Sequence, residues 1–156
     1  MIAGLEGCAR SSDSSARPSE ANTNLSALAG KIGNQSWQML SGGYWVNQDK
    51  SKYTIYLVGK SIDVCTQTMD PTQQGAIVSI LVPHAVGTYH SGPAFLYQGA
   101  NGQSQADIPV LNENIVITAE DQNGLVGNMN AQFAGADQVV TSDVSGTFHV
   151  VYCGVR

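Results

Sequence analysis

Alternating apolar and polar positions define two strands in the last third of the chain, residues 114–153. Ile115, Ile117 and Ala119 alternate with more polar residues, and every second residue in the stretch 125–133 is apolar or Gly. A period of two is typical of half-buried strands, and the polar residues between the two runs indicate a hairpin.

The length of the hairpin loop determines which residues face each other. A two-residue Asn-Gly turn would place both isoleucines opposite polar side chains. A three-residue loop ending at Gly124 instead pairs Ile117 with Met129 and Ile115 with Ala131, so that the apolar faces agree. We therefore predict a type I turn with Gly124 in the left-handed region.

The preceding residues have the same character, with short apolar runs divided by turn residues. Gly33-Asn34 predicts a hairpin turn, and Gly42-Gly43 is expected to break the chain before the next strand. Residues 76–82 are apolar almost throughout, which indicates a central strand covered on both faces and ended by Pro83. Residues 69–75 are expected to form a loop. Further strands are predicted at residues 44–46, 53–58, 62–65, 86–90, 94–98 and 105–110.

In total the pattern predicts about nine to eleven short strands and no amphipathic helix of useful length. The expected fold is all-β, either an antiparallel β-sandwich or a small closed β-barrel. Residues 25–156 of the 156-residue chain form a single domain in this interpretation. Residues 1–24 are rich in Ser, Ala, Asn and Pro and contain little to bury, so we expect a flexible tail or tether.

Charge is sparse and unevenly placed. Residues 61–155 contain no Lys or Arg, while their carboxylates are Asp63, Asp70, Asp107, Glu113, Glu120, Asp121, Asp137 and Asp143. Phosphate contacts require Lys or Arg, so a nucleic acid partner is not expected. Anionic membrane surfaces are disfavoured for the same reason, which leaves a lipid anchor as the only expected membrane contact.

Two of the three cysteines are expected to pair. Cys65 and Cys153 each end a predicted strand, and a low-charge surface suits an exported protein, in which disulfides form. The chain-entropy model gives such a bridge roughly 4–5 kcal/mol. The alternative is two unrelated buried thiols. A metal site is less favoured because neither a CxxC motif nor nearby histidines accompany them.

The residues around Cys8 resemble a lipobox, the segment of bacterial lipoproteins whose Cys becomes lipidated. Leu5, Gly7 and Cys8 match that pattern, and Glu6 departs from it. The alternative is an ordinary Cys in a polar tail. Cys8 is therefore a candidate lipidation site.

Residues 25–153 also resemble small secreted lipoproteins of bacteria. The matching stretches are Gly30 to Trp37, Val82-Pro83 with Gly87-Thr88-Tyr89, and Ile117-Thr118 with Gly127 and Gly146-Thr147-Phe148. The resemblance implies a β-rich fold in the bacterial envelope or outside the cell, and it implies no particular activity.

Candidates for chemistry are few. His84 and His90 could share a rim with Asp63 or Asp70, whereas His149 lies in the final strand. Neither a dense metal-ligand spacing nor a nucleophile, phosphate or dinucleotide motif accompanies them, so we expect no catalytic residue, metal or cofactor. The adjacent acids Glu120 and Asp121 resemble part of a calcium loop, but turn chemistry also explains them.

Aromatic residues are the candidate binding surface. If they point outward, they would offer an uncharged stacking platform to a saccharide or a protein edge, and core packing is the alternative. The six candidates are Trp37, Tyr44, Trp45, Tyr53, Tyr56 and Tyr89; Phe95 and Tyr97 follow in a later hairpin.

Three functions follow from these expectations. The first is a non-enzymatic, exported envelope lipoprotein that binds a small apolar or saccharide ligand or a protein, with homo-oligomerisation open. The second is a structural subunit of an extracellular assembly or virion. The third is a hydrolase, which requires a cleft that brings His84 or His90 within hydrogen-bond reach of a carboxylate.

Overall fold

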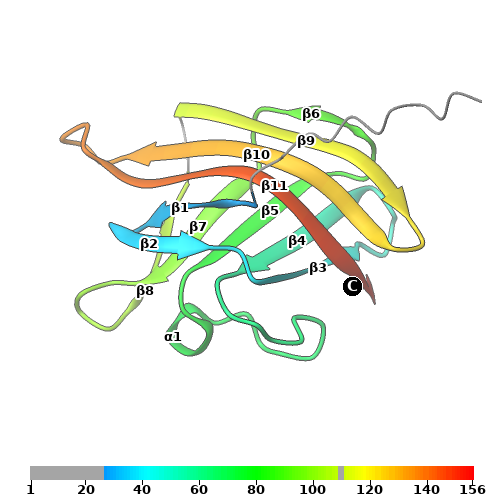
Figure 1. Cartoon of the computed structure of the whole chain (residues 1–156), viewed down its shortest axis with the longest axis horizontal. Helices are drawn as coiled ribbons and strands as arrows, with labels where there is room; N and C mark the ends of the chain where they lie inside the picture. The colour runs from blue at the N-terminus through cyan, green and yellow to red at the C-terminus, as the bar shows by residue number, and fades with distance from the viewer. Residues whose placement is uncertain (1–26, 109–110) are drawn as a thin grey trace, which may run out of the picture.

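The computed structural model describes residues 27–108 and 111–156, which form an all-β domain with one short helix (Figure 1). The strands are β1 (Ala29–Ile32), β2 (Gln35–Gln38), β3 (Ser41–Val46), β4 (Lys52–Val58), β5 (Ile77–Pro83), β6 (Gly87–Tyr89), β7 (Pro93–Gln98), β8 (Ser104–Asp107), β9 (Leu111–Asp121), β10 (Gly124–Ala134) and β11 (Val140–Val155), and the helix is α1 (Pro71–Gln74). The predicted tail of residues 1–24 and Cys8 lie outside the described residues. No helix in the described ranges is long and apolar enough to cross a membrane.

The strands form one hydrogen-bonded sheet of 11 strands, in the order β6-β9-β10-β11-β3-β4-β5-β7-β8, with β1 and β2 added beside β11. Every pairing is antiparallel except that of β11 with β3. The order ends at β6 and β8 without closing. Of the two expected architectures, the fold is therefore sandwich-like and the closed barrel is wrong.

The long strand β11 belongs to both layers of the sandwich. Its first part pairs with β10, from Val140 opposite Ala134 to Val150 opposite Leu125. Its last residues pair with β3, beginning with Val151 opposite Gly43. Figure 1 shows β9, β10 and β11 crossing above β3, β4 and β5. Apolar side chains from both layers form the core between them, including Ile117, Leu125, Met129, Tyr53, Ile55 and Leu57.

A second apolar cluster lies on the outer face of the β3–β5 layer. Trp45, Val58, Val64 and Ile77 pack there. The stretch between β4 and β5 covers them, and the disulfide between Cys65 and Cys153 ties that stretch to β11, with 5.1 Å between the Cα atoms. The expected disulfide is confirmed. β5 is covered on both faces at Ile77 and Val78, whereas Leu81 near its end is 49% exposed, so the expected covering of both faces holds for the first part of the strand only.

Two predictions for this covering stretch are wrong. Residues 62–65 do not form a strand; instead Asp63 accepts hydrogen bonds from the Cys65 amide and the Thr66 hydroxyl and makes a turn. Residues 69–75 contain α1, because Asp70 caps its amino end by accepting from the Thr72 amide at 2.9 Å, and Pro71 occupies the first turn.

The β9–β10 hairpin exists as predicted, and its register differs. The loop is the two-residue turn 122–123, and near the turn Leu125 faces Glu120. Between Val126 and Gly127 the register shifts by one, because Thr118 is an extra residue in β9. Ile117 therefore faces Gly127, and Ile115 faces Met129. The predicted pairs are wrong, although Gly124 has the expected positive φ, 136°.

The two glycine-containing dipeptides have different roles. Gly33 and Asn34 form the predicted turn between β1 and β2, with φ values of 57° and 65°. Gly42 and Gly43, expected to break the chain, lie inside β3. A Cβ on Gly42 would lie 2.6 Å from the Val150 side chain, and one on Gly43 would lie 2.6 Å from Cys153 Sγ. This pair of glycines thus allows β3 and β11 to approach closely.

Candidate functional site

An apolar hollow of about 420 Å³ lies where β1 and β3 diverge beside β11. We call this cavity the apolar hollow. Its apolar lining consists of Ala27, Leu28, Met39, Leu40, Val126 and Phe148. Leu28 and Phe148 are buried at its base, and Leu40 is 61% exposed. The size is that of a small-molecule site, and an occupant would remove Leu40 from water.

Polar groups border the apolar hollow. They are Thr118, Asn128, Thr147 and His149. The Thr118 hydroxyl donates to the Val126 carbonyl at 3.0 Å, and a ring nitrogen of His149 contacts the Asn123 carbonyl at 3.1 Å. Apolar walls with a few oriented polar groups are typical of ligand sites.

The shape of the hollow depends on Gly127 in β10. A Cβ at this position would lie 2.5 Å from the Phe148 ring and 2.6 Å from the Val116 carbonyl oxygen. The ring of Phe148 therefore packs directly on the Gly127 backbone, and a larger residue there would move it. The extra residue Thr118, which sets the β9 register, lies in the same wall.

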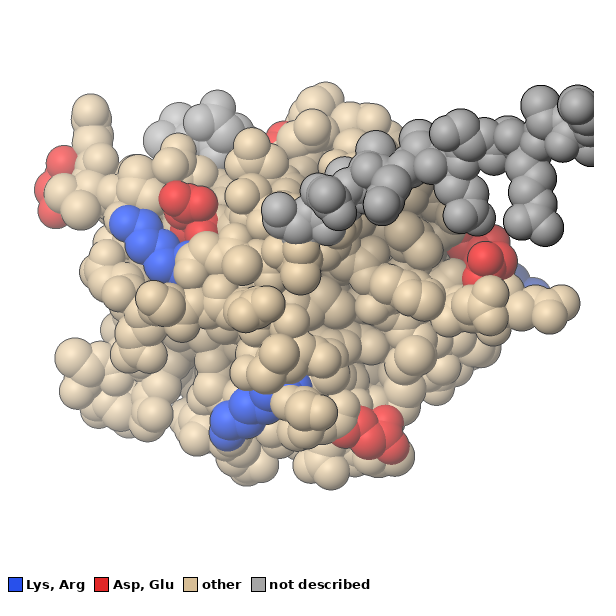
Figure 2. All heavy atoms as spheres, in the orientation of Figure 1, with Lys and Arg blue, Asp and Glu red and all other residues tan. Residues whose placement is uncertain are grey.

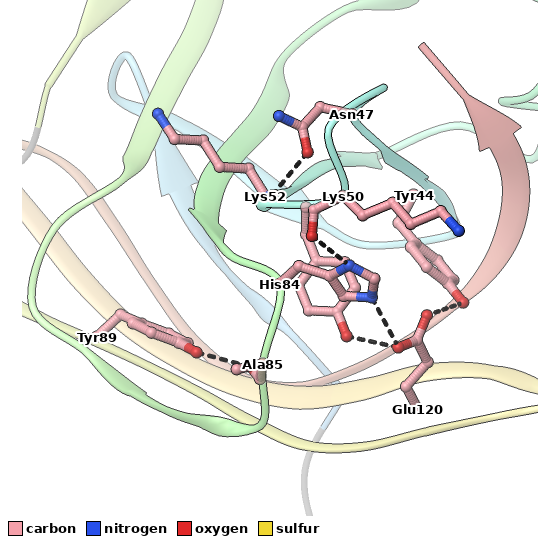
Figure 3. Close-up of polar contacts among 9 residues, drawn as sticks. Tyr44, Asn47, Lys50, Lys52, His84, Ala85, Tyr89 and Glu120 are labelled. Atoms are coloured by element: carbon pink, nitrogen blue, oxygen red, sulfur yellow. Dashed lines mark hydrogen bonds and ion pairs between the residues drawn. The ribbon is translucent and has the colours of Figure 1, made fainter.

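A second candidate site contains a carboxylate held by three side chains (Figure 3). Glu120, near the end of β9, accepts hydrogen bonds from the hydroxyls of Tyr44 at 2.9 Å and Tyr53 at 2.6 Å. The Nε2 atom of His84 lies 3.3 Å from the same carboxylate. We call these four residues the Glu120 cluster. They join the β3–β5 layer to β9 at one end of the sandwich.

The Glu120 cluster favours an ionised carboxylate and neutral phenols. Partial burial opposes ionisation of Glu120, but the hydrogen bonds from Tyr53 and Tyr44 and the contact with His84 outweigh it and hold its pKa below the ordinary value. Burial, followed by the hydrogen bond to Glu120, raises the pKa of both Tyr44 and Tyr53 well above the ordinary value. The two hydroxyls thus remain donors over a wide pH range.

Both ring nitrogens of His84 have partners. Nδ1 lies 2.9 Å from the Lys50 carbonyl oxygen, which can only accept, so Nδ1 carries a proton. The imidazole donates to both Lys50 and Glu120 when Nε2 is protonated as well. Through these two contacts His84 links the turn before β4 to Glu120 in β9.

Local turns hold this histidine in place. Lys50 has a φ of 57° in the turn between β3 and β4, where the Asn47 side chain accepts from the Lys52 amide at 2.7 Å. The Tyr89 hydroxyl donates to the Ala85 carbonyl at 2.6 Å and fixes the link that follows His84. The cluster borders a cleft of about 340 Å³ that also includes Asp121 and Tyr152.

The six aromatic candidates do not form the outward surface that was expected. Trp37, Tyr44, Trp45 and Tyr53 are buried, and Tyr56 and Tyr89 are half-buried. β3 is covered on both faces, so Tyr44 belongs to the main core and Trp45 to the outer cluster.

The other candidate side chains have structural partners. His90 Nδ1 contacts the Glu113 carbonyl at 3.1 Å. Asp63 and Asp70 stabilise local turns, so the carboxylate beside His84 is Glu120 rather than either of these. Asp121 accepts from the Asn123 amide at 2.7 Å, as turn chemistry predicts. In the described ranges no three His, Cys, Asp or Glu residues are grouped closely enough to hold a metal ion.

Two features were missed from the sequence. The pairing of His84 with Glu120 depends on how the two layers face each other, and no local pattern signals it. The apolar hollow and its polar border collect residues from five separate segments, and no local pattern in the sequence signals that they meet. Comparison of the chain with protein-family models, with curated proteins and with solved structures finds no match.

Proposed function

We propose that the protein is an exported, non-enzymatic binding domain that holds a small apolar ligand in the apolar hollow. The observation that carries this proposal is the hollow itself, about 420 Å³ in volume, with buried Leu28 and Phe148 at its base and a polar border. It lies among paired strands, so its walls are preformed. Preformed, mostly apolar concavities are where small ligands bind in proteins.

Export is supported by the disulfide and by the sequence. Cys65 and Cys153 form a bridge that closes a loop of 88 residues, and such bridges persist in oxidising compartments. Cys8 is the proposed site of lipid attachment in a bacterial envelope. Intact mass of the protein from its native host tests both points: lipidation at Cys8 and a two-proton mass gain on reduction are expected, and an unmodified chain with free thiols would contradict the proposal.

The ligand site is tested with N-phenylnaphthylamine, an uncharged apolar fluorophore. We expect its emission to rise on binding to the protein, and Leu40→Asp to abolish the rise because a charge at the mouth opposes apolar occupancy. Val86→Asp is the matched control: Val86 is also 61% exposed and does not line the hollow. Equal responses of the two variants, or no response of the wild type, would reject the proposal.

Hydrolysis is a second candidate because His84 and Glu120 lie 3.3 Å apart beside a cleft. It is the weaker one, since both ring nitrogens of His84 and both carboxylate oxygens of Glu120 already have partners. Turnover of a p-nitrophenyl ester that is abolished by both His84→Gln and Glu120→Gln, in folded variants, would reverse this order.

A further inference from the structure

A groove rich in side-chain amides is lined by residues of β2, β7, β8 and α1 and of the loops beside them. These elements lie at the end of the sandwich opposite the Glu120 cluster (Figure 1). Two hollows, of about 420 Å³ and about 280 Å³, share Gln35, Tyr97 and Gln98 and so form one groove, which we call the amide groove. It shares no lining residue with the apolar hollow.

Neutral hydrogen-bonding groups dominate the amide groove. Asn34, Gln35, Gln73, Gln98 and Gln105 supply amides. A side-chain amide has two donors and an acceptor, which matches ligands whose hydroxyls both donate and accept; Gln98 uses one donor on the Gly102 carbonyl at 3.3 Å. On the face shown in Figure 2, charged side chains are few and scattered among uncharged ones.

The charge of the groove disfavours ionic ligands. Among the described residues that line it, Lys60 is the only charged one. Its ammonium group already donates to the Gln73 carbonyl at 2.7 Å. A polyanionic ligand would therefore find a single, partly engaged cation in the lining, and a cationic ligand would find no carboxylate there.

Tyr97 is a fixed ring between the two hollows. Its hydroxyl donates to Asp107 at 3.2 Å, and that buried carboxylate also accepts from the Ser142 hydroxyl at 3.2 Å. The ring packs on Gly33, where a Cβ would lie 2.5 Å from ring carbon Cδ2. Rigid aromatic rings flanked by polar groups lose little entropy when a ligand packs on them.

We propose that the amide groove binds a neutral saccharide of at least two units, one in each hollow on either side of Tyr97. Sugar rings present apolar C–H faces to an aromatic ring and hydroxyls to amides, which is the combination that the groove provides. A mainly apolar ligand is disfavoured because it would leave the amides unpaired.

The test is calorimetric titration of the full chain with cellotetraose, maltotetraose and xylotetraose, and with tetragalacturonate as the anionic comparison. We expect at least one neutral oligosaccharide to bind and tetragalacturonate to bind at least roughly tenfold more weakly. Gln35→Ala and Gln98→Ala should each weaken that binding by at least roughly fivefold, because each amide is exposed and contributes to both hollows.

Gln38→Ala and Gln103→Ala are matched controls. Both glutamines are exposed, they lie in or beside the same strands, and neither lines the groove. They should leave affinity unchanged. The proposal fails if no neutral oligosaccharide binds at millimolar concentration, if the anion binds as well, or if the controls weaken binding as much as the groove variants. The Leu40→Asp variant should still bind saccharide, because Leu40 does not line the amide groove. A failed saccharide titration would therefore reject the amide groove without bearing on the apolar hollow.

Discussion

The Tyr53 hydroxyl donates a hydrogen bond of 2.6 Å to Glu120 and thereby connects the β3–β5 layer to β9. Tyr53 is 1% exposed, so its hydroxyl has no access to bulk water as an alternative partner. A buried phenol on one layer and a carboxylate on the other thus hold one end of the sandwich together.

Replacing Tyr53 by Phe should lower the free energy of unfolding by about 1–3 kcal/mol, because a hydrogen bond to a charged acceptor is lost. Tyr44→Phe should cost less, since its hydrogen bond is longer, 2.9 Å. Urea denaturation at neutral pH measures both. Equal stability of wild type and Tyr53→Phe would show that the contact contributes nothing.

Stability should fall at both extremes of pH, for reasons that can be separated. The pKa of Glu120 is held below its ordinary 4.5 in the fold, so its contribution is fully present above about pH 4.5 and is lost as pH falls through the folded pKa. The pKa values of Tyr44 and Tyr53 are raised above 10.0, so their contribution is present below pH 10 and is lost as pH rises through the folded pKa.

Variants assign these two losses. Glu120→Gln should flatten the acid side of the stability profile. The double variant Tyr44→Phe/Tyr53→Phe should flatten the alkaline side, because Phe does not titrate. The measurement is the free energy of unfolding in urea as a function of pH. An unchanged acid side in Glu120→Gln would mean that other carboxylates control it.

The disulfide should contribute about 4–5 kcal/mol by the chain-entropy model, since Cys65 and Cys153 are separated by 88 residues. We expect Cys65→Ser/Cys153→Ser to lower the free energy of unfolding in urea by this amount and to loosen the stretch between β4 and β5. Hydrogen exchange locates the effect. A global change without selective loss of protection in residues 59–76 would contradict the tethering role.

Two glycines with similar φ angles should differ in their tolerance of Ala. Gly124 has a φ of 136° and Gly154 a φ of 127°, but a Cβ on Gly124 would collide with the Val150 carbonyl oxygen, whereas nothing lies within 4 Å of one on Gly154. Gly154→Ala should cost about 1 kcal/mol from backbone strain alone. Gly124→Ala should cost more, because it also separates β10 from β11. Thermal unfolding of the two variants compares these costs directly.

The strand pattern of the sequence was sufficient for fold class and insufficient for register. Near the turn, the pairing of β9 with β10 places the apolar Leu125 opposite the charged Glu120. The pairing must therefore shift by one residue before the apolar residues of the two strands can face each other. The sequence allows two solutions, a longer loop or a bulge, and the protein uses the bulge at Thr118. Alternation alone does not distinguish them, because both give the same pattern of apolar positions.

The aromatic surface was misassigned for a related reason. In β3, Tyr44 and Trp45 point to opposite faces, and a run of aromatic residues looks the same whether one face or both are covered. What covers the second face is the stretch between β4 and β5, whose position depends on the bridge between Cys65 and Cys153. The sequence predicted that bridge, but not the packing that it enables.

The place of β11 between β10 and β3 has a consequence for synthesis. Without residues 140–155, β6, β9 and β10 have no hydrogen-bonded strand pairing with β3, β4, β5, β7 and β8, and β1 keeps only β2 as a neighbour. Because β11 follows all the other described strands in the sequence, the two groups of strands in a nascent chain cannot be joined into one sheet before residues 140–155 have been synthesised. The strand that joins the two layers is therefore the last of the described strands to be synthesised.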